Sequence, residues 1–207
     1  TRVDQNKGTN ASLAPGAMVT DYDRWNAHAN LKRKHWQLSF WGAEQTDGGT
    51  GVGVTSILDP KGFQKSQQYL ADIRYSTEDN YSDWQFDTKL SYLYSAFDSR
   101  FNLFPDGAVV PIGLDGNPSS SGNDVVFPDG VIGIPGREYH MPSLEVVSLY
   151  KGWDDHLLRT AVGYRYESIS TTETKNFGPG VINGTEGTVN GALTDVSGTE
   201  HVYLPND

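Results

Sequence analysis

The stretch "LLRTAVGYRYESIS", residues 157–170, alternates between two kinds of side chain almost without interruption. Successive side chains of an extended strand leave opposite faces of a sheet. One face is therefore expected to carry Leu158, Thr160, Val162, Tyr164 and Tyr166, and the other Arg159, Ala161, Gly163, Arg165 and Glu167. Fold and function both depend on whether the apolar face packs on a protein core or on lipid.

Five further stretches show the same period of two. We expect antiparallel strands near residues 22–32, 35–44, 67–76, 83–98, 142–151 and 156–170. Short polar connections join the first strand to the second, the third to the fourth and the fifth to the sixth. Gly-, Pro-, Ser- and Asn-rich segments are expected to form long loops near 45–65, 99–140 and 171–207. Because they recur at every second connection, they should project from one end of the sheet, as in an outer-membrane barrel.

Composition excludes several classes of protein. The 207 residues contain no Cys, which rules out disulfide scaffolds and thiolate metal sites. A formal net charge of −10 argues against nucleic acid as a partner, since phosphate binding needs a basic surface. No run of about 18 apolar residues is present, so no transmembrane helix is expected. A barrel strand, however, needs only about 9–11 residues of alternating character.

The apolar face carries aromatic residues at two heights. On the fourth strand, Trp84 and Tyr94 are separated by about 33 Å, which is about 25 Å of height at a tilt of roughly 40°. That height matches the apolar band of a membrane barrel, where Trp and Tyr gather at the two interfaces. The opposite face would be a wet lumen wall. Its predicted polar residues are Arg24, His28, Asp72, Arg74, Asp87, Lys89, Glu145, Lys151, Arg159, Arg165 and Glu167.

These patterns predict an all-β protein: an antiparallel up-and-down meander that is part of a large transmembrane β-barrel. Residues 1–21 are expected to form an irregular N-terminal segment, and residues 22–207 a partial barrel region of about six strands. Six strands cannot close a bacterial barrel, because the smallest use eight. The chain, which begins at Thr1, is therefore expected to be an internal piece of a larger barrel.

Several stretches resemble TonB-dependent outer-membrane receptors. "LLRTAVGYRYESISTTETKNFGPG" and "WQFDTKLSYLYSAFDSRFNLFP" are similar to barrel strands that enter extracellular loops, and "GTEHVYLPND" to the end of such a loop. The resemblance implies a 22-stranded barrel, plugged by an N-terminal domain, in the outer membrane of a Gram-negative bacterium. It implies TonB-powered import of a scarce ligand such as a ferric siderophore, cobalamin or an oligosaccharide. No TonB box or plug motif precedes Tyr22, so the region that contacts TonB is expected outside this chain.

Two other functions remain open at this stage. One is a secreted soluble β-sandwich or β-barrel binding module, for example for carbohydrate, with Trp25, Trp36, Trp41 and Trp84 as stacking platforms. The other is an enzyme on a β scaffold, although no G-x-S-x-G motif is present.

Local motifs assign no site. The Gly-rich stretch Gly48–Ser56 lacks the Lys of a phosphate-binding loop, and Asp115–Asp124 lacks EF-hand spacing. The five His residues (His28, His35, His140, His156 and His201) show no paired metal-ligand spacing. We therefore expect no catalytic residue, no cofactor and no metal, and the ligand-binding residues are not identified.

Overall fold

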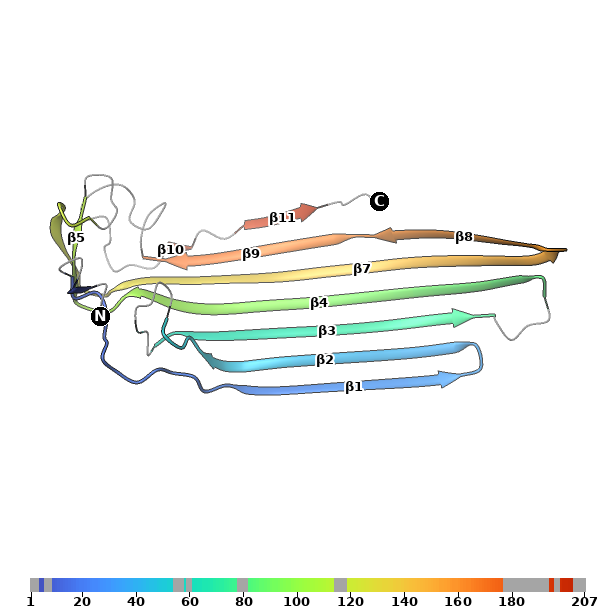
Figure 1. The fold of residues 1–207 in the computed structure, drawn as a ribbon, viewed down its shortest axis with the longest axis horizontal. Coiled ribbons are helices and arrows are strands. Elements are labelled where there is room, and N and C mark those ends of the chain that lie inside the picture. Colours follow the sequence, from blue (N-terminus) through green and yellow to red (C-terminus); the bar gives the residue numbers. More distant parts are fainter. Residues whose placement is uncertain are drawn as a thin grey trace.

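The computed structural model describes residues 4–5, 9–53, 58, 61–77, 82–113, 119–176, 194–195 and 198–202. Its named elements are all strands, and most of them belong to one antiparallel sheet (Figure 1). The all-β fold and the antiparallel pairing predicted from alternation are confirmed.

The sheet is built in the order β1-β2-β3-β4-β7, followed by β8 and β9. These strands are β1 (Asp23–Arg33), β2 (Trp36–Gly49), β3 (Phe63–Ser76), β4 (Trp84–Phe104), β7 (Val131–Trp153), β8 (His156–Arg165) and β9 (Glu167–Lys175). Two short strands, β10 (Thr194–Asp195) and β11 (Gly198–Val202), pair with β9. A separate hairpin is formed by β5 (Ala108–Ile112) and β6 (Asn123–Phe127). It lies at the end of the sheet opposite the β1–β2 and β7–β8 turns (Figure 1).

Strands β4 and β7 are longer than the alternation predicts. They contain 21 and 23 residues, whereas strands of soluble domains usually have about 5–6. The extra length falls in the segment 99–140, which the sequence predicts as a loop. Pairs such as Phe101 with Gly133 continue the ladder there, and the β5–β6 hairpin occupies the middle of the segment. The predicted loop is thus shorter and contains strands of its own.

Two prolines interrupt the hydrogen bonding of β7, one on each side. The amide of Tyr166 donates to the carbonyl of Pro142 at 3.0 Å, but Pro142 has no N–H to return the bond, and the outer strand divides there into β8 and β9. On the other side, the β4–β7 register skips the positions beside Pro135. The Ser99 hydroxyl donates to the carbonyl of Pro135 at 3.2 Å, so that acceptor is still satisfied.

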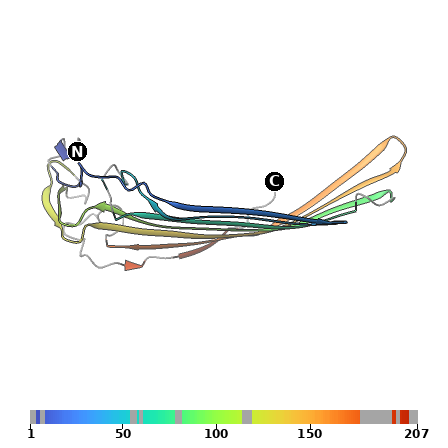
Figure 2. The ribbon, with the colours of Figure 1, turned by 90° about the horizontal axis from the view of Figure 1, so that it is seen from below.

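The sheet is not closed. Among the described residues, β1 pairs only with β2, and β8 pairs only with β7. Viewed along its edge, the sheet is a single layer whose β7–β8 turn splays away from the rest (Figure 2). Both of its broad faces are therefore free of a second packed layer in the part of the chain that is described.

The main cluster of buried apolar residues lies at one end of the molecule. We call this cluster the cap: the β5–β6 hairpin with the adjoining ends of β4 and β7, and Ala11 of the N-terminal segment. Phe127 and Val131 are fully buried there. The side chain of Asn10 accepts a hydrogen bond from the amide of Val109 at 2.7 Å. The cap thus has a core of its own, which the long sheet lacks.

Candidate functional site

The strand register aligns the apolar side chains across six strands. The residues that follow one another directly across the sheet are Leu31, Leu38, Ile73, Leu90, Leu144 and Tyr164, which we call the apolar band. Leu31 is 64% exposed, Leu90 51% and Tyr164 63%. No described segment covers the band, although a contiguous apolar surface of this kind is rarely left in water.

Aromatic rings flank the apolar band on the side of the two-residue turns, which we call the turn-side margin. The ring centres of Trp36 and Tyr75 are 4.8 Å apart, and those of Trp84 and Tyr150 are 4.7 Å apart. Phe86 stacks on Trp84 at 5.9 Å. The Trp36–Tyr75 and Trp84–Tyr150 contacts join neighbouring strands through their side chains, which is the usual source of sheet stability beyond the backbone.

A second set of rings lies toward the cap, which we call the cap-side margin. Tyr69 is 6.3 Å from Trp25 and 6.1 Å from Tyr94, and the Tyr94 ring lies 5.1 Å from His140. The apolar face therefore carries rings at two heights, as the sequence predicts, with aliphatic residues between them.

Several polar groups at the cap-side margin are hydrogen-bonded to one another. The carboxylate of Glu44 accepts hydrogen bonds from Trp25 Nε1 at 3.1 Å and from Gln67 Nε2 at 2.9 Å. The Tyr92 hydroxyl and His140 Nδ1 are 2.7 Å apart. An aromatic ring with an apolar body and a satisfied polar tip suits a boundary between apolar and wet surroundings.

A glycine allows close packing at this margin. Gly42 lies opposite Tyr69, and a Cβ at Gly42 would approach a ring carbon of Tyr69 to 2.9 Å and one of Phe40 to 3.2 Å. The Tyr69 ring covers the place of the missing side chain. Glycine costs strand stability by itself, and a ring packed over it compensates for that cost.

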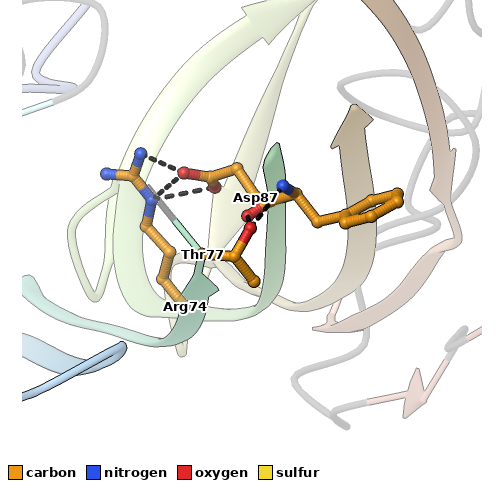
Figure 3. A network of polar contacts seen from close by, with 4 residues as sticks. Arg74, Thr77 and Asp87 are labelled. Atoms are coloured by element: carbon orange, nitrogen blue, oxygen red, sulfur yellow. Dashed lines mark hydrogen bonds and ion pairs between the residues drawn. The ribbon is translucent and has the colours of Figure 1, made fainter. Parts of the chain in front are cut away.

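The opposite face is polar near the turns and forms a shallow hollow of about 420 Å³, which we call the turn-side hollow. Its charged lining residues are Asp72, Arg74, Asp87, Lys89, Glu145 and Arg159. The guanidinium of Arg74 forms an ion pair with Asp87, with Nε 2.8 Å from both carboxylate oxygens (Figure 3). Lys89 Nζ lies 3.4 Å from the carboxylate of Asp72. The cations Arg74 and Lys89 are thus each neutralised by a neighbouring carboxylate.

Figure 3 also shows Thr77, which directly follows β3. Its hydroxyl accepts a hydrogen bond from the backbone amide of Phe86 on β4.

A second hollow of about 290 Å³ lies on the same face nearer the cap, and we call it the cap-side hollow. Arg24, Gln45, Ser66, Phe97 and Arg137 lie opposite one another across five strands and line it. Between the two hollows the face turns apolar, in a row of directly paired residues on β2, β3, β4 and β7. This row is Trp41, Leu70, Leu93 and Met141. The charged positions that the sequence pattern assigns to this face did not predict this row.

The remaining sequence motifs do not converge on one place. Trp25, Trp36 and Trp84 lie on the apolar face, but Trp41 lies on the opposite face, so the four rings form no common platform. His140 lies in the cap-side margin, whereas His28 hydrogen-bonds Asn30 and His35 lies beside Tyr75. Parts of Gly48–Ser56 and Asp115–Asp124 fall outside the described residues.

Two features are absent from the described residues, a metal site and a membrane-spanning helix. Among the residues that the structure describes, no group of three or more His, Asp or Glu side chains is arranged to hold a metal ion. No helix in that part of the chain has the length and apolar character to cross a membrane. Comparison with known proteins adds no assignment: no family model, curated protein or solved structure matches this chain.

Proposed function

We propose that this chain forms part of the wall of a transmembrane β-barrel in the outer membrane of a Gram-negative bacterium. The barrel would belong to a TonB-dependent receptor that takes up a scarce ligand such as a ferric siderophore. TonB would contact a region of the receptor outside this chain. The function is binding and passage, without bond-making chemistry.

The observation that carries the proposal is the exposed apolar band between two aromatic margins. In water, an uncovered row of six apolar residues would be costly. In a bilayer the same row would contact hydrocarbon, and the rings would lie at the interfaces. The polar opposite face, with its paired charges, suits a water-filled or protein-filled lumen.

Strands β1 and β8, which each pair with one strand only among the described residues, support the same proposal. A sheet in a membrane must satisfy every backbone N–H and C=O within the protein, so its edges have to be joined by further strands. The described sheet would therefore be one sector of a larger closed wall.

A fluorescence experiment on the full chain tests the membrane contact. Two single-tryptophan variants are compared, one keeping Trp84 and one keeping Trp41, with the other four Trp replaced by Phe. In vesicles whose lipids carry bromine near the headgroup end of the acyl chains, Trp84 should be strongly quenched and Trp41 should not. Equal quenching of the two, or no quenching of either, would contradict the proposal.

Hydrodynamic behaviour gives a second test. Because the apolar face has no cover, the purified chain should need detergent or should self-associate. Light scattering that shows a detergent-free monodisperse monomer would favour the secreted binding module. The uptake step needs the complete receptor: cells in which residues 22–176 are deleted from it should lose ligand import.

A further inference from the structure

The two hollows on the polar face differ in how their charges are compensated. In the turn-side hollow, Arg74 is paired with Asp87, and Lys89 lies beside Asp72. In the cap-side hollow, Arg24 and Arg137 form no ion pair with any described residue. Arg159 of the turn-side hollow also forms no such ion pair, but the carboxylates of Asp72, Asp87 and Glu145 equal in number the three cations of that hollow. The cap-side hollow is thus the one of the two in which guanidinium groups are not matched by carboxylates.

The acidic residue along the cap-side hollow does not offset these charges. Glu44 lines the hollow, but its carboxylate is engaged on the apolar face by Trp25 and Gln67. Strand alternation explains this, because Glu44 lies opposite Trp25 whereas its neighbour Gln45 lies opposite Arg24. The backbone of β2 therefore separates the carboxylate from the two arginines.

The surface between the two arginines can bind hydroxyl groups and ring faces. Arg24 and Arg137 lie at the two ends of a row of directly paired residues that crosses five strands. Four strand spacings separate them, so their backbones are about 19 Å apart. Gln68 and Ser95 line the hollow between them, and no side-chain hydrogen bond engages either within the described residues. Trp41 and Phe97 add aromatic rings to the same lining.

We propose that the cap-side hollow binds an acidic saccharide, meaning linked sugar rings that carry carboxylate or sulfate groups. A guanidinium holds such an anion through a planar pair of N–H bonds. Amide and hydroxyl side chains exchange hydrogen bonds with sugar hydroxyls, and aromatic rings pack on the C–H faces of the sugar. The width of the row favours more than one sugar ring. The inference rests on the proposed function, because it takes this face as the ligand-facing wall of the barrel.

Calorimetry on the full chain in detergent micelles tests the inference. The probe is tetragalacturonic acid, and the matched neutral ligand is maltotetraose. The acid should bind at least about tenfold more tightly, which is the effect of one charge-assisted hydrogen-bonded contact. Arg24→Gln and Arg137→Gln should each weaken binding of the acid about tenfold, and the affinity should fall as salt is added.

Matched variants separate the site from general charge effects. Arg159→Gln removes a guanidinium from the turn-side hollow on the same face and should leave affinity unchanged. Arg137→Lys keeps the charge but loses the planar fork, so it should bind the acid more weakly than the original chain. Trp41→Ala should weaken binding of both tetrasaccharides, because it removes a ring and no charge.

Three results would overturn the inference. They are equal affinity for the two tetrasaccharides, equal affinity for inorganic sulfate and the acid, and unchanged binding in the Arg24 and Arg137 variants. The inference would also be overturned if the chain is folded, as shown by a strand-rich circular dichroism spectrum, and still does not bind the acid. That failure is separate from failure of the proposed function: quenching of Trp84 but not Trp41 would persist if only the saccharide inference were wrong, and would be lost if the wall itself were wrong.

Discussion

Leu90 of β4 lies directly opposite Leu144 of β7 on the apolar face, and the two side chains are 51% and 43% exposed. Their neighbours Ser91 and Ser143 are also opposite each other, but on the polar face. Adjacent residues of either strand therefore lie on different faces, one in the apolar band and the next on the polar face. This contrast allows the two faces to be compared at nearly the same depth.

Arginine placed on the two faces should have unequal effects. In lipid vesicles, Leu90→Arg should lower the free energy of unfolding by about 2–4 kcal/mol, because a guanidinium would meet hydrocarbon. Ser91→Arg should cost much less, since the polar face already holds water or charged groups. Val162→Arg and Ala161→Arg form a second matched pair on β8. Urea titrations of the four variants give the values, and equal penalties on both faces would refute a membrane contact.

The packing of Tyr69 over Gly42 should be measurable as a coupling energy. Gly42→Ala should destabilise the sheet by about 1–3 kcal/mol, because the added Cβ would overlap the Tyr69 ring. In the double variant with Tyr69→Ala, the overlap disappears, so the two effects should not add. A double-mutant cycle measured by denaturant unfolding tests this. Additive losses would mean that the ring does not pack against residue 42.

Asn176 should stabilise the junction between β9 and β7. It is 3% exposed; its side chain accepts a hydrogen bond from the amide of Ile132 at 2.8 Å and donates one to the carbonyl of Gly130 at 3.0 Å. Asn176→Leu should cost about 1–3 kcal/mol for each group left without a partner. Amide exchange at Ile132 should accelerate. The exposed Asn30→Leu is the control and should change stability little.

The cap should unfold separately from the long sheet when its core is emptied. Phe127 is fully buried, so Phe127→Ala should cost the cap about 3–5 kcal/mol. Val126, the preceding residue of β6, is 57% exposed, and Val126→Ala should have little effect. Hydrogen exchange should show lost protection in β5 and β6 with β1–β3 unchanged. A uniform loss across the sheet would instead indicate one cooperative unit.

Alternation predicted the two faces of the sheet correctly because the period of two leaves no freedom once a strand is assigned. Leu38, Ile73 and Leu90 share the apolar face as predicted, and the register places them in one row. The two-residue connections, such as Lys34–His35, also lie where the sequence places polar turns.

Alternation was less informative where prolines interrupt the hydrogen bonding of a strand. The predicted strand 142–151 begins at Pro142, and Pro135 falls in the predicted loop 99–140, yet β7 runs through both prolines, because each leaves one side of the strand free to pair. The cap could not be predicted for another reason. Its core joins Ala11 to Phe127 and Val131, which are far apart in the chain and show no shared local pattern.

Within the described part of the chain, β1 and β8 each pair with one strand only, which makes this sheet a template for growth. Another strand can join the outer side of such a strand through backbone hydrogen bonds without any change of shape. Once separated from neighbouring strands, one molecule could add the β1 edge of another to its own β8 edge, and the added molecule would again present the same two outer strands. Such addition has no natural stopping point, so it would yield open ribbons. A closed ring would form only if the curvature of the sheet brought the last edge back to the first.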